Sequence, residues 1–323
     1  MKAAIYFVCL CVFSNIIVVS AILDVIVGAV AHFTDRLFQK DDLLEPFDYE
    51  RLKTDLKDSL YGQHIASEVV LKAVSGFMTD KHPSKPLVLS FHGGTGVGKN
   101  HVSNIIARSI YKKGETSKHV HVFISEHHFP HKEQVGTYKF QLQQWIRGNV
   151  SSFPHSMFIF DEMDKMNPGL IDAIKPFLDH YPHVDGVSYR KAIFIFLSND
   201  GASVINQIAF DSWMDGEERE NLQMNSRGME TNIFRDVFNA KNSGFWHSTL
   251  IDAHLIDHFI PFLPLEYRHV RHCVIDQMAA LNITAKDGLA DRVAQELLYF
   301  PTQEKIFSVK GCKSVRQKLL LHV

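Results

Sequence analysis

The sequence predicts an α/β fold, in which a parallel sheet is covered by helices on both faces and is followed by a smaller helical C-terminal subdomain. Short, mostly apolar runs recur between residues 87 and 197, and helical patterns alternate with them. After residue 263 these runs cease and only helical patterns follow. Strands without polar alternation are typical of a parallel sheet that is buried on both faces.

Four apolar runs are interpreted as strands because each is short and bounded by polar or turn-forming residues. They cover residues 87–91, 120–124, 157–160 and 192–197. The first three are followed by helical patterns over residues 99–112, 138–149 and 169–178. Pro261 and Pro264 mark a boundary, since proline ends an element. Beyond them we expect helices over residues 265–281, 287–300 and 313–321.

The composition is that of an ordinary folded protein. The chain has 323 residues, of which 46% are hydrophobic and 22% are charged, and its length suits a large domain and a smaller one. Its net charge is −2, and it has no run of lysine and arginine long enough to follow a nucleic-acid backbone. A nucleic-acid partner is therefore not expected.

The amino terminus has the pattern of a secretory signal peptide. Met1 and Lys2 precede an apolar segment over residues 3–19, and the small residues Ser20 and Ala21 follow. We expect a signal over residues 1–20, with an uncleaved membrane anchor as the alternative. A second apolar stretch, residues 22–33, favours interfacial membrane association, and a buried helix is the alternative reading.

Two of the four cysteines lie in the predicted signal, which leaves Cys273 and Cys312. A secreted chain would enter a compartment where these two could form a disulfide, although two buried thiols are the alternative. Glycosylation sequons begin at Asn149 and Asn282, and they fit the same compartment.

A phosphate-binding loop is predicted between the first strand and its helix. The segment Gly-Gly-Thr-Gly-Val-Gly-Lys-Asn ends in Gly-Lys and has the required strand–loop–helix context. Its backbone N–H groups can surround the phosphates of ATP, while Lys99 reaches the β- and γ-phosphates. The predicted ATP-binding residues here are Gly93, Gly94, Thr95, Gly96, Val97, Gly98, Lys99 and Asn100.

Asn100 departs from the usual loop, because serine or threonine normally stands there and places a hydroxyl on Mg²⁺. An amide oxygen can also approach the ion, so we expect Asn100 to be a weaker magnesium ligand.

Asp161 and Glu162 follow the apolar run 157–160. A strand that delivers carboxylates to its C-terminal end predicts Asp161 on Mg²⁺ and Glu162 as the general base for the attacking water. A solvated strand end is the alternative reading of such a pair.

Two further polar residues are candidates for catalysis. Asn199 follows the run 192–197 and could position the attacking water, although a turn or helix cap explains it equally well. Lys313 precedes the last helix and could bring charge to the phosphates, although most surface lysines are merely solvated. Five histidines between residues 119 and 131 do not predict zinc, since no cysteine lies near them in sequence.

In this order, these residues resemble the AAA+ ATPases, and specifically the Clp/HSP100-like branch. Within that branch the chain is similar to the torsins, closest to the torsin-1 type. The resemblance extends over about residues 50 to 318. It is carried by residues 61–64, 93–100, 142–150, 158–166, 170–178, 242–248 and 311–313.

The resemblance implies a parallel five-stranded sheet over residues 50–263 and a small helical subdomain over residues 264–323, after a membrane-associated segment and linker over residues 21–49. It places Gly62 and Gln63 beside the adenine, Asn199 at the sensor-1 position and Lys313 at sensor 2. It also implies that Cys273 and Cys312 form a redox pair near the nucleotide.

The resemblance further implies an ATPase with chaperone-like remodelling activity in the endoplasmic reticulum lumen and perinuclear space, assembled as a homo- or hetero-oligomer. Its activator would be the lumenal domain of lamina-associated polypeptide 1 or of its endoplasmic-reticulum relative, which supplies an arginine finger.

Two absences in the sequence bear on this function. No arginine lies between Arg235 and Arg268, where the branch would carry its finger. No aromatic–aliphatic–glycine pore signature precedes Tyr138, so threading of polypeptide through a pore is not expected. The alternative function is an ATP-dependent binding module or scaffold with negligible hydrolysis.

Overall fold

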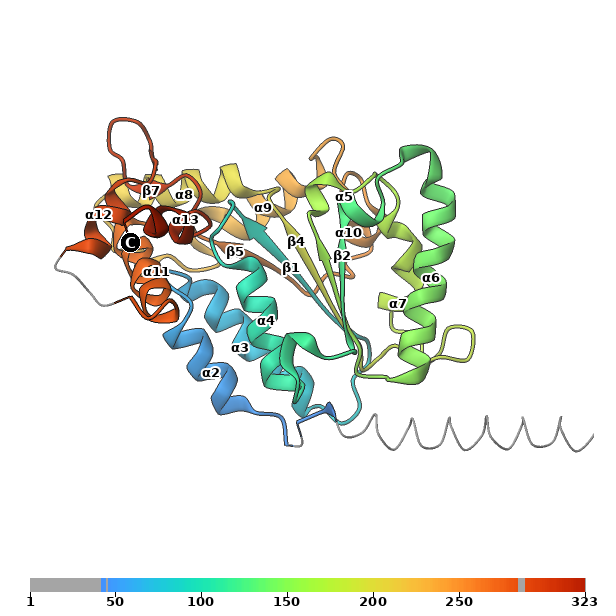
Figure 1. Cartoon of the computed structure of the whole chain (residues 1–323). Coiled ribbons are helices and arrows are strands. Elements are labelled where there is room, and N and C mark those ends of the chain that lie inside the picture. The colour runs from blue at the N-terminus through green and yellow to red at the C-terminus, as the bar shows by residue number, and fades with distance from the viewer. Residues whose placement is uncertain (1–41, 45, 284–287, 323) are drawn as a thin grey trace, which may run out of the picture. The chain divides into compact units, whose positions relative to one another are not determined.

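Five parallel strands form the central sheet, in the order β2-β3-β4-β1-β5 (Figure 1). The computed structural model describes residues 42–44, 46–283 and 288–322. The predicted signal, the apolar stretch 22–33 and most of the linker therefore lie outside the described residues. The strands are β1 (Leu87–Gly93), β2 (Val120–Ile124), β3 (Met157–Asp161), β4 (Ile193–Ser198) and β5 (His258–Phe262).

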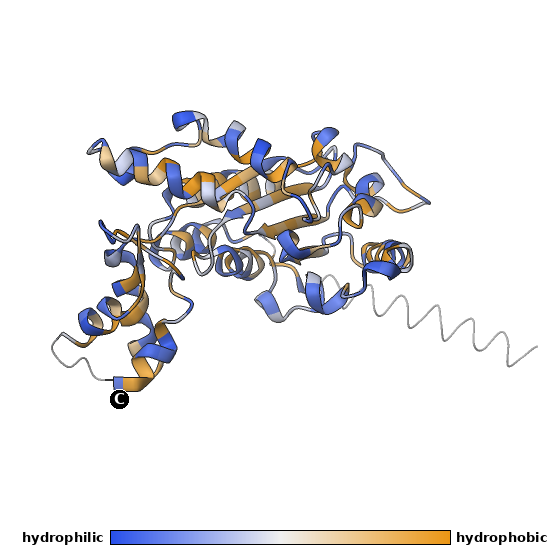
Figure 2. Ribbon diagram, turned by 90° about the horizontal axis from the view of Figure 1, so that it is seen from above, coloured by the Kyte–Doolittle hydropathy of each residue, from blue (hydrophilic) through white to orange (hydrophobic). Residues whose placement is uncertain are grey.

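Burial on both faces explains why β1, β3 and β4 are mostly apolar, whereas the edge strand β2 alternates between buried and exposed residues. Every residue of β1 and β4 is buried, and so are the first four residues of β3. Figure 2 shows the apolar strands between helical layers whose outer surfaces are mostly hydrophilic. The prediction of a parallel sheet covered on both faces is confirmed.

Helices on both sides of the sheet complete this layered unit (Figure 1). Helix α4 contacts β1 and β4, while α8 contacts β1 and α9 contacts β5. Among the described residues, no helix combines the length and the apolar character needed to cross a membrane. The helices that precede or surround the strands are α2 (Tyr49–Asp58), α3 (His64–Thr79), α4 (Lys99–Ile110), α5 (Ser125–His128), α6 (Val135–Ser152), α7 (Lys175–Leu178), α8 (Ala202–Met214), α9 (Met229–Phe238) and α10 (Thr249–Asp252).

The C-terminal region is helical, but the prediction that strands cease after residue 263 is wrong. Its helices are α11 (Tyr267–Ala280), α12 (Leu289–Gln295) and α13 (Val315–Leu319). Between the last two, β6 (Tyr299–Phe300) pairs with β7 (Phe307–Ser308) in an antiparallel ladder. Two-residue strands are too short to produce a periodic pattern in the sequence. Phe300 also precedes Pro301, which disfavours the helical backbone that we expected as far as residue 300.

The helix expected over residues 169–178 is also interrupted. A 3₁₀ segment, Ile171–Ile174, precedes the single-turn helix α7. Pro176 has no amide hydrogen, so an α-helix that ran through it would lose the bond to the residue four positions earlier. Similarly, α13 ends at Leu319 and the chain continues as the 3₁₀ segment Leu320–His322.

Candidate active site

The loop between β1 and α4 wraps around the amine of Lys99. Its Nζ donates to the carbonyl oxygens of Gly93 at 2.5 Å and Gly94 at 2.8 Å. A third bond, of 3.1 Å, goes to Oδ1 of Asn199 at the end of β4. Gly98, with φ of 113°, allows the sharp turn from which α4 begins at Lys99. The loop therefore holds a buried cation beside the N-terminus of a helix, which is an anion-binding arrangement.

The charge of Lys99 is balanced between burial and nearby carboxylates. Burial lowers the pKa of its ammonium group to about 8, while the charges of Asp164 and Asp161 raise it and that of Lys313 lowers it. An amine in this state is mostly protonated at pH 7 and would gain from a phosphate beside it.

Asp161 and Glu162 stand at the C-terminal end of β3 and line the same cavity as the loop. Asp161 Oδ2 accepts from Nδ2 of Asn100 at 2.7 Å. Oε1 of Glu162 lies 3.0 Å from Nζ of Lys165, which also pairs with Glu126 at 2.9 Å. Both predicted magnesium ligands, Asp161 and Asn100, are therefore adjacent.

The donor set of this pair fits Mg²⁺ in part. The carboxylate of Asp161 is a ligand of the kind that Mg²⁺ prefers. Asn100 presents its amide nitrogen to Asp161, so its amide would have to turn before the oxygen could face a cation. Asp161 is thus the stronger candidate ligand of the two.

A cavity of about 480 Å³ opens in front of the loop. One wall carries Tyr61, whose ring stacks on His272 with the centroids 5.0 Å apart. The Tyr61 hydroxyl donates to Oδ2 of Asp276 at 2.7 Å, and burial together with this bond raises the pKa of Tyr61 to about 12. The residues that line the cavity include Thr95, Gly96, Val97, Gly98, Lys99, Asn100, Asp161, Glu162, Asn199 and Lys313.

Four of the residues predicted to bind ATP do not line this cavity. They are Gly62, Gln63, Gly93 and Gly94. Gln63 is buried, and its amide nitrogen donates to the carbonyl oxygens of Val97 and Leu263. The Leu263 N–H donates back to Oε1 of Gln63 at 2.8 Å. Gln63 therefore ties the phosphate loop to the end of β5, and Tyr61, two residues before it, lines the cavity.

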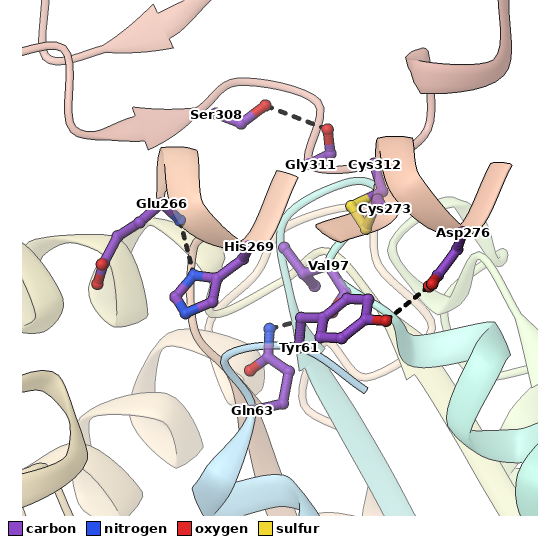
Figure 3. Close-up of a disulfide and its surroundings, with 10 residues drawn as sticks. All are labelled: Tyr61, Gln63, Val97, Glu266, His269, Cys273, Asp276, Ser308, Gly311 and Cys312. Atoms are coloured by element: carbon purple, nitrogen blue, oxygen red, sulfur yellow. Dashed lines mark hydrogen bonds between the residues drawn. A yellow bond between two sulfur atoms is a disulfide. The ribbon is translucent and has the colours of Figure 1, made fainter. Parts of the chain in front are cut away.

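A disulfide joins Cys273 on α11 to Cys312, with a Cα–Cα distance of 6.1 Å (Figure 3). The Cys312 N–H donates to the carbonyl oxygen of Gly96 at 3.0 Å. A Cβ on Gly311 would lie 2.3 Å from that same oxygen, and a Cβ on Gly96 would lie 2.1 Å from the oxygen of Lys310. The backbone of the C-terminal segment thus lies against the backbone of the phosphate loop, and Lys313 lines the cavity.

The predicted glycosylation residues lie apart from the cavity. Asn149 is in the last turn of α6, where its Nδ2 donates to the oxygen of Trp145. Asn282 is exposed just after α11, whereas the threonine of its sequon lies outside the described residues. Of the clustered histidines, His119 stacks on Phe153 and His121 on Phe158. In the described part of the chain, no three His, Cys, Asp or Glu residues are grouped in a way that could hold a metal ion.

Sequence reasoning did not single out Asp164, Tyr61 or Asp276. Asp164 lies on the 3₁₀ turn Met163–Lys165 and accepts two hydrogen bonds from Asn199. Its signal in the sequence was its position two residues after Glu162. Tyr61 was visible as an aromatic residue before the Gly-Gln pair, whereas nothing in the sequence connects it with Asp276, 215 residues away.

The sheet order, the phosphate loop at the end of β1 and the polar ends of β3 and β4 define a AAA+ nucleotide-binding protein of the Clp/HSP100 type. Solved structures share this fold. A closed-state reconstruction of Hsp104 with ATPγS and FITC casein aligns at a TM-score of 0.60 and 15% identity, covering 86% of this chain and 47% of that one. The S. cerevisiae Hsp104–ADP complex aligns at 0.60 and 16% identity, covering 87% and 47%. The chain spans about half the length of these proteins.

The chain belongs to the torsin family. The family model described as Torsin matches residues 37–160, and the one described as Torsin-1A, C-terminal domain, matches residues 265–322. The first match contains the phosphate loop. The second contains Lys313 and the two cysteines of the disulfide, Cys273 and Cys312. Family membership and the AAA+ fold support an ATPase that binds nucleotide with a metal ion.

Proposed function

We propose that this chain hydrolyses ATP in a Mg²⁺-dependent reaction and uses the energy for chaperone-like protein remodelling. The observation that carries the proposal is the convergence of Lys99, Asp161, Glu162 and Asn199 on one cavity. These four side chains come from the loop after β1 and from the ends of β3 and β4.

Each residue has a distinct task in this reaction. Lys99 binds the β- and γ-phosphates, and Asp161, with Asn100 as a second ligand, would hold Mg²⁺. When bound, the ion would neutralise part of the negative charge on the phosphates. Glu162 accepts a proton from the attacking water, and Asn199 orients that water. Lys313 adds positive charge from the C-terminal segment.

The reaction requires an arginine from a partner. Transition-state charge on the phosphates is commonly stabilised by an arginine finger, which contributes about 10³-fold or more in rate. The sequence has no arginine between Arg235 and Arg268, and none lines the cavity among the described residues. The proposed donor is the lumenal domain of lamina-associated polypeptide 1 or of its endoplasmic-reticulum relative.

The proposed site of action is the lumen of the endoplasmic reticulum and the perinuclear space, with peripheral membrane contact through residues 21–49. Membership of the torsin family supports this location, and the predicted signal and sequons agree with it. Assembly into a homo- or hetero-oligomer belongs to the same proposal. Because the Cys273–Cys312 disulfide holds the segment that contacts Gly96, its reduction would alter nucleotide affinity.

A second candidate function is an ATP-dependent scaffold with negligible hydrolysis. The ion pair between Glu162 and Lys165 favours it, because one oxygen of the proposed base is engaged within the chain. The asparagine at position 100 favours it as well, since it replaces the usual hydroxyl ligand.

Phosphate release from ATP by the full chain, measured alone and with the partner's lumenal domain, tests the proposal. We expect slow release by the chain alone and strong stimulation in the mixture. Nucleotide binding without hydrolysis in either condition would leave the scaffold function and remove the enzymatic one. The Lys99→Ala variant is the control for contaminating ATPases.

A further inference from the structure

Both carboxylate oxygens of Asp164 are used by one residue. Oδ1 accepts from the backbone N–H of Asn199 at 3.0 Å, and Oδ2 accepts from its side-chain Nδ2 at 3.0 Å. Asn199 lies at the end of β4, 35 residues further along the chain. This two-point clamp fixes both the position of the backbone and the rotation of the amide.

The clamp determines which atom of Asn199 faces the phosphate loop. With Nδ2 bound to Asp164, Oδ1 is directed toward Nζ of Lys99 at 3.1 Å. A flipped amide would place an N–H group against the ammonium of Lys99 and an oxygen against the carboxylate of Asp164. Both contacts would be repulsive, so the carboxylate permits one orientation only.

The turn that carries Asp164 is held firmly in place. The carbonyl oxygen of Met163 accepts from the Gly244 N–H at 2.9 Å, and the hydroxyl of the neighbouring Ser243 donates to Oδ2 of Asp200. The packing there is tight, since a Cβ on Gly244 would lie 2.9 Å from Cβ of Met166. Asp164 can therefore act as a fixed anchor for Asn199.

We propose that Asp164 is a positioning residue of the nucleotide site, which acts through Asn199 and gives the site its preference for ATP over ADP. The inference rests on the proposed function, because it requires the nucleotide to bind at the loop of Lys99. Asn199 is the residue to which this function gives the orientation of the water that attacks the γ-phosphate, so its own orientation should matter more for ATP than for ADP, which has no γ-phosphate. Asp164 itself is not among the residues that line the cavity.

The test measures the dissociation constants of ATP and ADP for the full chain in a Glu162→Gln background, which prevents turnover. Asp164→Asn keeps the shape of the side chain and removes the charge. We expect the preference for ATP over ADP to fall by about 10-fold, the value for a hydrogen bond that involves a charged group. Asn199→Ala should cause a similar loss, and the double variant should lose no more than either single one.

Asp172→Asn is the matched control. Asp172 also accepts two hydrogen bonds, one from the Ser248 hydroxyl and one from the Thr249 backbone N–H. It does not line the cavity. This variant should lower the melting temperature without changing the nucleotide preference. If Asp164→Asn does not fold, Asp164→Ser takes its place in the comparison of single and double variants. Serine also removes the charge and keeps a side-chain oxygen that can accept a hydrogen bond.

Equal weakening of ATP and ADP binding by Asp164→Asn would overturn the proposal, and so would additive losses in the double variant. Neither readout requires hydrolysis. A chain that binds nucleotide with the expected coupling but never turns it over would refute the proposed ATPase and leave the role of Asp164 intact.

Discussion

Lys99 is a buried amine whose proton depends on its surroundings. Its carbonyl and amide partners, Gly93, Gly94 and Asn199, are neutral, and the carboxylates of Asp161 and Asp164 supply the compensating charge. A phosphate would be a stronger counter-charge than either. The side chain is therefore prepared for an anion at a cost in the free protein.

This state predicts that nucleotide affinity depends on pH. The folded-state pKa of Lys99, about 8, lies below the ordinary 10.5, so the free chain loses this proton as the pH rises through 8. Phosphate binding favours the charged form. Affinity for ADP should thus be nearly constant below pH 7 and fall about 10-fold between pH 7 and pH 9. Titration calorimetry at several pH values measures it.

The control for this titration is Lys99→Met, which should bind ADP weakly and with no slope in the same range. An equal slope in this variant would assign the pH dependence to another group. Tyr61 is not a candidate, because its pKa of about 12 keeps it protonated throughout.

Glu162 provides the second prediction at this scale. Glu162→Gln removes the proposed base while keeping the side-chain volume, so ATP binding should persist and turnover in the activated state should fall by about 10²-fold or more. Glu126→Gln is the matched control, because Glu126 pairs with the same Lys165 but does not line the cavity. Unchanged turnover in Glu162→Gln would remove this residue from the mechanism.

At the scale of elements, the contact between the phosphate loop and the segment before α13 depends on glycine. Gly311 has φ of 49°, and a Cβ there would meet the Gly96 carbonyl at 2.3 Å. Gly311→Ala should lower stability by about 2 kcal/mol, from backbone strain and steric overlap, and should weaken nucleotide binding as well.

Gly186→Ala is the control for backbone strain alone. Gly186 has φ of 80°, but a Cβ there would have no atom within 4 Å. Gly186→Ala should lower the free energy of unfolding by about 1 kcal/mol and leave nucleotide affinity unchanged. Urea unfolding and ADP titration of both variants provide the comparison, and equal affinities would show that the contact is not required for the site.

The sequence predicts elements where the physical signal is local. The apolar runs before Gly93 and Asp161 identify buried strands, since a strand covered on both faces is mostly apolar. The loop residues Lys99 and Asn100 are recognised by their spacing. The hairpin β6–β7 and the interrupted helix before Pro176 escape prediction, because two-residue strands and 3₁₀ turns have no period to detect.

Long-range contacts are the part that sequence reasoning could not supply. The role of Gln63 depends on Leu263, 200 residues later, and the clamp of Asp164 on Asn199 depends on the neighbouring order of β3 and β4. The order of the strands in the sheet brings these residues together. Gln63 is therefore recognisable in the sequence as part of a motif, whereas its bonds to Val97 and Leu263 are not.

At the scale of the whole molecule, the described residues assemble one side of the proposed catalytic site. The residues proposed for phosphate binding and for the base lie at the ends of β1, β3 and β4, and Lys313 from the C-terminal segment lines the same cavity. The missing component is a cation that could stabilise charge on the γ-phosphate during its transfer. A partner that supplies an arginine would complete the site only when it is bound, so hydrolysis would follow the presence of the partner.

Single-turnover hydrolysis of bound ATP tests this account most directly. The rate is measured for the chain bound to the partner's lumenal domain and for a complex whose partner arginine is replaced by alanine, at equal ATP occupancy. We expect the substitution to slow hydrolysis by about 10³-fold or more, with binding of ATP unchanged. Equal rates in the two complexes, or in the chain alone, would contradict the claim that this chain carries only half of its catalytic site.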